Sequence, residues 1–170
     1  GFKQTKGQFF THINIVRFML WGLQLDKFAI EKVNKENELL YVIDPSAGSG
    51  TFLIEFMKFI TENIKRKYKN KLNETVDIED KFNQWFLPDA RENRWAAKYV
   101  YGVEHSFDLG TATKVNMILH GDGSSNIFVQ DGLLPFSSYS KEESLNKLSQ
   151  SKKEKSYYNK ELNEQFDVII

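Results

Sequence analysis

The segment at residues 44–53, which reads DPSAGSGTFL, holds the residue types that point most directly to chemistry. Gly48 and Gly50 allow the backbone to turn tightly and to approach a bound ligand closely. Free backbone amides at the start of a following helix would attract an anionic group such as a carboxylate or a phosphate. A tight turn without any ligand is the competing interpretation, and the Gly-Ser-Gly triplet alone does not decide between the two.

Comparison with other glycine-rich loops narrows the class of ligand. Leu53 stands where the third glycine of the dinucleotide fingerprint G-x-G-x-x-G is expected, and the Walker lysine is also absent. Asp44 precedes the loop, and a carboxylate there suits a ligand with an ammonium group better than a pyrophosphate. Asp44 could instead cap the loop. These features disfavour an NAD-dependent oxidoreductase, which remains the rival enzyme class.

Three further side chains are candidates for contacts with a nucleoside. Glu104 is expected at the end of the second strand, where an acid in nucleoside-binding α/β domains accepts hydrogen bonds from ribose hydroxyls. His105 could lie against an adenine ring, and Asp131 could accept a hydrogen bond from the adenine amino group. Each residue also has an interpretation without a ligand. Glu104 could be a solvated surface acid, His105 a partly buried structural histidine, and Asp131 part of an Asp-Gly turn.

The elements that must position these residues follow from the apolar pattern. Continuous apolar runs bounded by turn residues indicate strands buried on both faces of a parallel sheet. Such buried strands are expected at residues 39–43 and 99–103, a short third strand at 126–130 and a further strand at 166–170. Helices are expected within 8–25, after a turn, and at 51–64 and 106–120, the last capped by Ser106 and ended by Gly121. This alternation predicts an α/β fold with a mainly parallel sheet, whose ligands bind at the carboxyl ends of the strands.

Three polar stretches interrupt this pattern. Residues 27–38 are charged and are predicted to form a surface connection. Residues 69–94 are predicted to be a polar insertion, longer than a usual connection. Residues 137–165 are rich in Ser, Lys, Glu and Asn, which predicts either a mobile loop or an exposed helix.

The overall composition excludes several classes of protein. A chain of 170 residues with 41% hydrophobic residues can bury one ordinary core. Its 23 basic and 23 acidic residues cancel, whereas a module that grips DNA by itself is usually basic. The absence of Cys excludes a disulfide framework and a thiolate metal site and fits a reducing, cytoplasmic interior. No metal site and no membrane span is expected, and the first residue, Gly1, indicates a piece of a larger protein.

Two motifs in order resemble those of the adenine-N6 DNA methyltransferases. Residues 44–53 resemble the Asp-Pro-Ala-Cys-Gly-Ser-Gly-x-Phe-Leu motif of that group. Residues 6–11, KGQFFT, resemble the Gly-Gln-Phe-Phe-Thr-Pro segment that precedes it in the modification subunits of type I restriction systems. His12 replaces the proline, so the local turn could differ, although backbone contacts could persist. Residues 101–104 and 119–121 are also similar, and the resemblance implies a Rossmann-like S-adenosylmethionine-dependent methyltransferase fold, incomplete at its C-terminus.

The resemblance also implies a domain organisation. Residues 1–170 would form one partial methyltransferase domain, in which residues 1–38 are an N-terminal cofactor-binding segment and helix. Residues 39–136 would be the cofactor-binding core, with the insertion at about 69–94, the polar loop at 137–165 and the start of the fourth strand at 166–170.

It further implies a set of cofactor-binding residues for S-adenosylmethionine. The methionine side would be lined by Gln8, Phe9, Phe10, Thr11 and His12. The methionine and sugar would be wrapped by Asp44, Ala47, Gly48, Ser49 and Gly50, the ribose held by Glu104, and the adenine met by His105 and Asp131. The implied partners are DNA, bound through parts outside this chain, a specificity subunit, and a restriction subunit as a further candidate. A methyltransferase acting on RNA or protein, and a binding module with a degenerate pocket, remain alternatives, although the Gln-Phe-Phe-Thr segment favours the DNA group.

The first prediction is that this polypeptide alone does not transfer methyl groups. The catalytic motif of the family, Asn or Asp followed by Pro-Pro and an aromatic residue, is expected just after Ile170, and it does not occur in residues 1–170. Without it, the flipped adenine has no group to hold its amino nitrogen or to stack on its ring. Incubation with tritiated S-adenosylmethionine and mixed-sequence DNA should leave the DNA unlabelled, and label in adenine would contradict the prediction.

Overall fold

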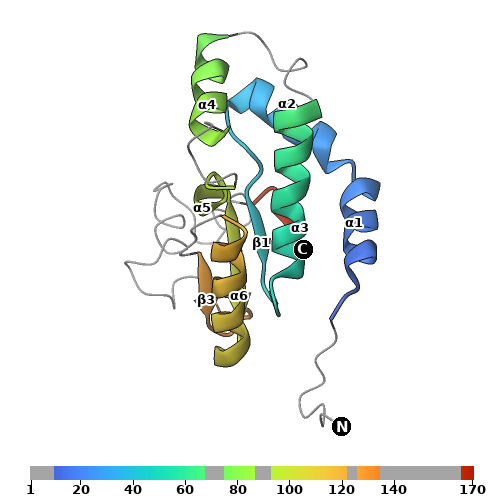
Figure 1. Cartoon of the computed structure of the whole chain (residues 1–170), viewed down its shortest axis with the longest axis vertical. Helices are drawn as coiled ribbons and strands as arrows, with labels where there is room; N and C mark the ends of the chain where they lie inside the picture. The colour runs from blue at the N-terminus through green and yellow to red at the C-terminus, as the bar shows by residue number, and fades with distance from the viewer. Residues whose placement is uncertain (1–9, 68–74, 87–92, 122–125, 135–165) are drawn as a thin grey trace, which may run out of the picture.

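Helices and one parallel sheet make up the computed structural model, which describes residues 10–67, 75–86, 93–121, 126–134 and 166–170 (Figure 1). The strands are β1 (Val42–Asp44), β2 (Val100–Glu104), β3 (Ile127–Val129) and β4 (Val168–Ile169). The helices are α1 (Ile13–Gly22), α2 (Leu25–Glu36), α3 (Thr51–Ile60), α4 (Val76–Phe86), α5 (Ala96–Tyr99) and α6 (Phe107–Leu119). A π-helical segment, η1 (Thr61–Lys67), continues α3.

The four strands are all parallel and lie in the order β3-β2-β1-β4. Strands β2 and β3 follow on one side of β1, and β4 lies on the other, so the strand order reverses at β1. In open parallel sheets, ligands bind at the carboxyl edge next to such a reversal. The predicted α/β fold with a mainly parallel sheet is therefore confirmed, and it is compatible with a Rossmann-like methyltransferase fold.

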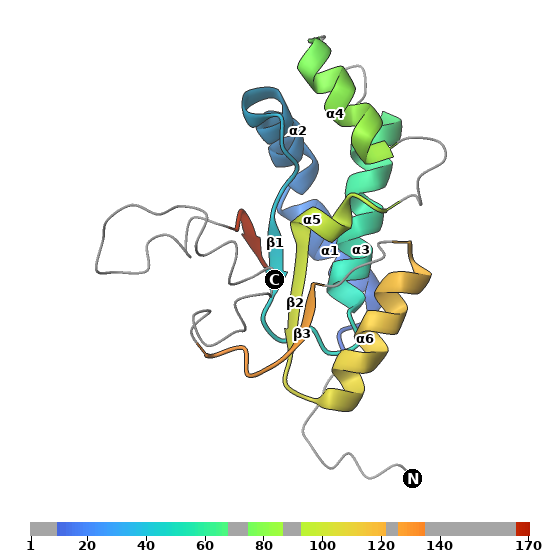
Figure 2. The same ribbon diagram turned by 90° about the vertical axis from the view of Figure 1, so that its left-hand side faces the viewer.

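The sheet separates two apolar clusters. Helices α3 and α6 lie on one side of it in Figure 2, and they close the larger cluster over the strand residues Val42, Val100, Ile127 and Val168. The opposite face carries the smaller cluster, made of Ile43, Tyr101, Val103 and Phe128. Because strand side chains alternate between faces, β1 and β2 are buried on both sides, as the sequence predicts for parallel strands, whereas Ile169 of the edge strand β4 is exposed.

The helix after β2 is confirmed at both ends. The Ser106 hydroxyl accepts a hydrogen bond from the Leu109 amide at 3.5 Å, and Gly121 adopts a φ of 87° just beyond the helix. The strand bounds differ slightly from expectation, since Leu39 and Leu40 are fully buried but precede β1. Tyr99 is the last residue of α5 and leads into β2.

The predicted surface connection at residues 27–38 is wrong, because most of it belongs to helix α2. The charges mask an apolar face, formed by Leu25, Ala29 and Val33 at helical spacing, which is buried in the main cluster. The helix expected within residues 8–25 is confirmed as α1, and Gln24, with a left-handed φ of 52°, separates it from α2. Helix α2 also contacts the chain next to β4, because Lys32 Nζ forms an ion pair with Asp167 Oδ1 at 2.7 Å.

The stretch at residues 69–94 is not only the polar insertion that was predicted. It contains helix α4, whose side chains Ile78, Phe82, Trp85 and Phe86 are all buried in the main cluster. Polar residues between them occupy the other side of the helix and hide the spacing. Residues 137–165 lie outside the described residues, so the mobile loop or exposed helix there stays a prediction.

The second prediction concerns Gly102, at the centre of β2. A β-carbon there would lie 2.8 Å from Leu53 Cδ1, 2.9 Å from Ile127 Cδ1 and 3.2 Å from Ala47 Cβ, so Gly102→Ala should overpack the core. We expect it to lower the free energy of unfolding by about 1–3 kcal/mol in urea denaturation. Gly22→Ala is the matched control, because no atom lies within 4 Å of its β-carbon position. Equal stabilities of the two variants would contradict the prediction.

Candidate functional site

The glycine loop at residues 44–50 joins β1 to α3 at the carboxyl edge of the sheet. Backbone bonds fix its course, because the Ala47 amide donates to the Val103 carbonyl at 2.8 Å and the Gly50 amide donates to the Ala47 carbonyl at 2.7 Å. The first bond holds the loop against β2, and the second closes a turn that leads into the helix. The loop therefore lies beside the strand reversal that the topology marks as a ligand site.

Both loop glycines adopt backbone conformations that other residues rarely take. The φ angle is 54° at Gly48 and 83° at Gly50, in the left-handed region where a β-carbon causes strain. At Gly50 space is also limiting, since a β-carbon would lie 2.9 Å from Thr113 Cγ2 on α6. The glycines that the sequence singles out are thus required by geometry, and the turn is built against α6.

Two side chains of α6, which the sequence analysis missed, bond to the loop. Thr113 Oγ1 donates to the Gly48 carbonyl at 2.5 Å, and Asn116 Nδ2 donates to the Ser49 carbonyl at 3.1 Å. Their spacing of three residues puts them on one face of the helix. That spacing, in a helix predicted to follow Glu104, places both side chains on one face but does not show which residues they contact.

The acids at the ends of β1 and β2 both lie at this loop. Glu104 is 8% exposed, and its carboxylate accepts from the Gly48 amide at 2.9 Å and from the Ser106 amide at 2.7 Å. Asp44 is 4% exposed and accepts from the Ser46 amide at 2.9 Å. Burial raises the pKa of Asp44 to about 6, the Ser46 amide opposes this shift, and the charge of Glu104 adds to it. The structure thus brings together two of the predicted site residues as a buried acidic pair.

The other two residues predicted to contact a nucleoside, His105 and Asp131, follow β2 and β3 at the same edge of the sheet. His105 is exposed. Asp131 Oδ1 accepts a hydrogen bond from the Leu133 amide at 3.0 Å. This bond closes the Asp-Gly turn that the sequence offered as the alternative to an adenine contact. Gly132 brings this turn to the glycine loop, because a β-carbon on it would lie 2.2 Å from the Pro45 carbonyl oxygen. Phe107, another residue missed by the sequence analysis, is 73% exposed at the start of α6.

The N-terminal segment is described only in part. Gln8 and Phe9 lie outside the described residues, whereas Phe10, Thr11 and His12 are exposed just before α1. In both overall views, the start of α1 lies at the same end of the molecule as the loop that follows β1 (Figures 1 and 2).

The replacement of proline by His12 leaves a proline-like backbone. His12 has a φ of −63°, close to the value that a proline ring imposes, and its Nδ1 accepts from the Asn14 amide at 3.2 Å as a helix cap. This φ angle is one that a proline could adopt, and the difference in the local turn stays a prediction.

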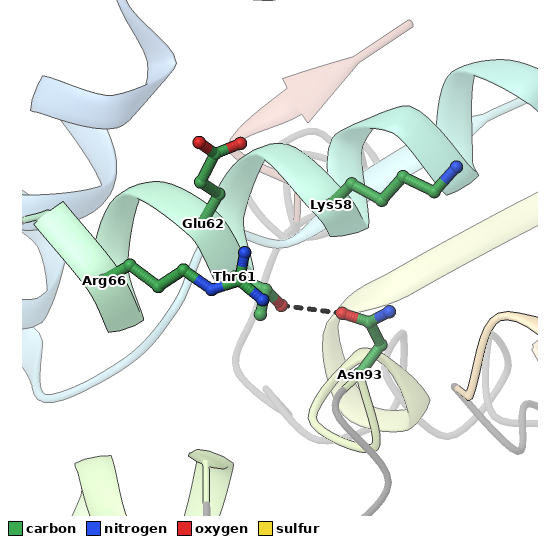
Figure 3. Close-up of a pocket in the computed structure, with 5 residues that line it drawn as sticks. All are labelled: Lys58, Thr61, Glu62, Arg66 and Asn93. Atoms are coloured by element: carbon green, nitrogen blue, oxygen red, sulfur yellow. Dashed lines mark hydrogen bonds between the residues drawn. The ribbon is translucent and has the colours of Figure 1, made fainter.

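A separate hollow of about 260 Å³ lies at the far end of α3. It is lined by Lys58, Thr61, Glu62, Arg66 and Asn93, as Figure 3 shows. Thr61 Oγ1 donates to Asn93 Oδ1 at 2.7 Å and accepts from Trp95 Nε1 at 2.9 Å. These hydrogen bonds join η1 to the segment that precedes α5. The ten-residue helix α3 separates this hollow from the glycine loop by about 15 Å. We therefore assign it a structural role and centre the candidate site on the loop.

The described part of the chain contains neither a cluster of metal ligands nor a helix that could span a membrane. No group of three or more His, Asp or Glu side chains there is placed to hold a metal ion. None of the helices described has both the length and the apolar character needed to cross a membrane.

A parallel sheet with a glycine loop at its strand reversal and acids at the ends of β1 and β2 is typical of open α/β domains, whose ligands bind at the carboxyl edge of the sheet. The profile of the N-6 DNA Methylase family matches residues 2–147 of the 170, so the chain belongs to that family of DNA methyltransferases. This match confirms the family resemblance seen in the two sequence motifs.

A curated relative adds the context of restriction. The chain is similar to the "Type II restriction enzyme and methyltransferase RM.BcgI" of Heyndrickxia coagulans, with 32% identity over 104 residues. The matched region is 61% of this chain and 12% of the relative, so the chain spans only a small part of that protein's length.

The third prediction follows from the burial of Asp44. Its pKa of about 6 in the folded chain exceeds its ordinary value of 3.8, so the native state binds this proton more tightly than the unfolded state. The free energy of unfolding should therefore fall as pH rises from about 4 to about 6, by about 3 kcal/mol in total. Asp44→Asn removes the charge and keeps an oxygen for the Ser46 amide. We expect this variant to be more stable than the parent at about pH 8 and to lose that advantage near pH 4.

Urea denaturation at both pH values measures this difference. Asp80→Asn, which removes an exposed carboxylate on α4, is the matched control and should have little effect at either pH. A stability gain for Asp44→Asn that is independent of pH would show that the buried charge is not its cause.

Proposed function

We propose that this chain binds S-adenosylmethionine at the carboxyl end of β1 and forms the cofactor-binding part of an adenine-N6 DNA methyltransferase. Membership of the N-6 DNA Methylase family supports the reaction class. The observation that carries the cofactor assignment is the Glu104 carboxylate, which is buried and held against the glycine loop by the Gly48 amide.

The hydrogen-bonding capacity of Glu104 suits a ribose. An ionised carboxylate offers about four lone-pair positions, and backbone amides of Gly48 and Ser106 use two of them. The two that are left match the two hydroxyls of a ribose. Because both oxygens are already fixed by backbone amides, the carboxylate loses little conformational freedom when it accepts them.

The environment of Asp44 suits the ammonium group of the methionine end. A buried carboxylate with a raised pKa gains from any nearby positive charge, which also offsets the repulsion from Glu104. A pyrophosphate would instead add negative charge beside two acids. This electrostatic argument favours S-adenosylmethionine over a dinucleotide such as NAD.

The other predicted contacts belong to the same proposal. The segment Gln8 to His12 would line the methionine side, loop residues Ala47 to Gly50 would wrap the methionine and sugar, and His105 and Asp131 would lie at the adenine. DNA would be the substrate, with a specificity subunit to read the target site and a cytoplasmic location. These partners rest on the family resemblance and on the restriction context of the relative.

The fourth prediction tests the ribose assignment by calorimetric titration of the full chain with S-adenosylhomocysteine. We expect binding in the micromolar range or weaker, and none to NADH or ATP. Glu104→Ala should weaken this binding by about 1.5–3 kcal/mol, the scale of a hydrogen bond to a charged group. Glu104→Gln keeps the shape of the side chain and one acceptor oxygen, so it should lose less. Unchanged affinity of Glu104→Ala would show that the ribose lies elsewhere.

The reaction class needs a separate assay on a longer protein that contains this chain. Tritiated S-adenosylmethionine should label adenine in DNA, and digestion should release the label as N6-methyladenine. Label in RNA or in protein would favour the alternative substrates. Binding of NADH in place of S-adenosylhomocysteine would reject the methyltransferase proposal.

A further inference from the structure

The glycine loop is built from small residues, which have no large side chains whose contacts could fix the conformation of the backbone. Gly48 and Gly50 each adopt left-handed φ angles, and rotation about their bonds is cheap in a free chain. A bound cofactor would nevertheless need the loop amides to point in fixed directions before it arrives. The bonds from α6 supply that constraint, since Thr113 and Asn116 bind two successive loop carbonyls.

We propose that Thr113 and Asn116 are positioning residues that aim the backbone amides of the loop at the cofactor. This inference rests on the proposed function. In a trans peptide the carbonyl and the following amide point in opposite directions. Thr113 draws the Gly48 carbonyl toward α6 and so turns the Ser49 amide to the side of the loop away from α6.

The neighbouring peptide shows the same geometry at work. Asn116 draws the Ser49 carbonyl toward α6, and the Gly50 amide in that peptide points the other way, where it donates to the Ala47 carbonyl at 2.7 Å. One carbonyl bond therefore sets the turn, and the other sets the direction of the Ser49 amide. The pair acts on peptide planes rather than on the ligand itself.

The bond from Thr113 is not a consequence of burial alone. Thr113 is 0% exposed, so its hydroxyl needs an acceptor, and the Leu109 carbonyl one turn earlier already lies at 2.8 Å. That local bond would satisfy the single hydroxyl proton. The Gly48 carbonyl lies closer, at 2.5 Å, and the Thr113 methyl fills the space that a side chain on Gly50 would need. The Thr113 hydroxyl thus contacts the loop at the Gly48 carbonyl, and the Thr113 methyl contacts it at Gly50.

This separation allows a test by two substitutions of Thr113. Valine keeps the shape and loses the hydroxyl, whereas serine keeps the hydroxyl and loses the methyl. If the hydroxyl positions the loop, Thr113→Val should raise the Kd for S-adenosylhomocysteine about five-fold, the effect of one lost hydrogen bond. Thr113→Ser should stay within about two-fold of the parent. Thr111→Val, at an exposed threonine of the same helix, is the matched control and should bind as the parent does.

The order of the two variants decides the question. A packing role predicts that valine binds at least as well as serine, and that result overturns the proposal. Asn116→Ala provides a second measure, which decides alone if Thr113→Val does not fold: weaker binding with an unchanged Tm supports the proposal, and unchanged affinity overturns it. All titrations use the full chain. If the parent itself binds no S-adenosylhomocysteine, the proposed function fails and this inference falls with it, whereas a binding parent with the wrong order of variants rejects only the inference.

Discussion

The hydrogen bonds that hold the glycine loop from outside are the interactions on which the site depends. A loop that must come close to a ligand has to be built from small residues, and small residues cannot fix their own backbone. The structure resolves this conflict with bonds from two neighbours. Strand β2 holds the loop through the Val103 carbonyl and the Glu104 carboxylate, and α6 holds it through Thr113 and Asn116. The element order explains why both holders are available, since α6 directly follows β2 in the chain.

The same arrangement lowers the stability of the protein without a ligand, because it buries two acids close together. Asp44 and Glu104 are both buried at the carboxyl edge, and burial together with the charge of Glu104 raises the pKa of Asp44. Stability alone would favour a neutral side chain at position 44. The ammonium group of the proposed cofactor would reverse that preference, because it would interact favourably with the charge of Asp44. Violations of local stability rules of this kind are expected where a protein binds or reacts.

Sequence reasoning succeeded where one residue type has one physical use. Gly48 and Gly50 were identified because left-handed turns need glycine, and the bounds of α6 followed from Ser106 and Gly121. It failed where charge concealed a helical apolar face, as in α2 and α4, since the apolar residues there are sparse and widely spaced. It could not find Thr113 and Asn116, because their role depends on a contact with residues about 65 positions earlier in the chain. The positions of Glu104 and Asp131 relative to the loop likewise required the strand order.

That strand order also decides which elements lie beside the glycine loop at the carboxyl edge. Strand β4 pairs with β1 in parallel, with Ile43 opposite Ile169, and the Ile170 amide donates to the Ile43 carbonyl at 3.0 Å. The carboxyl end of β4 therefore lies beside Asp44, on the side of β1 that β2 does not cover. Asp167 secures this pairing, because its carboxylate accepts from the Tyr41 amide and from Lys32 at once. In this arrangement, β2 and α6 hold the loop from one side of β1, and β4 pairs with β1 on the other side.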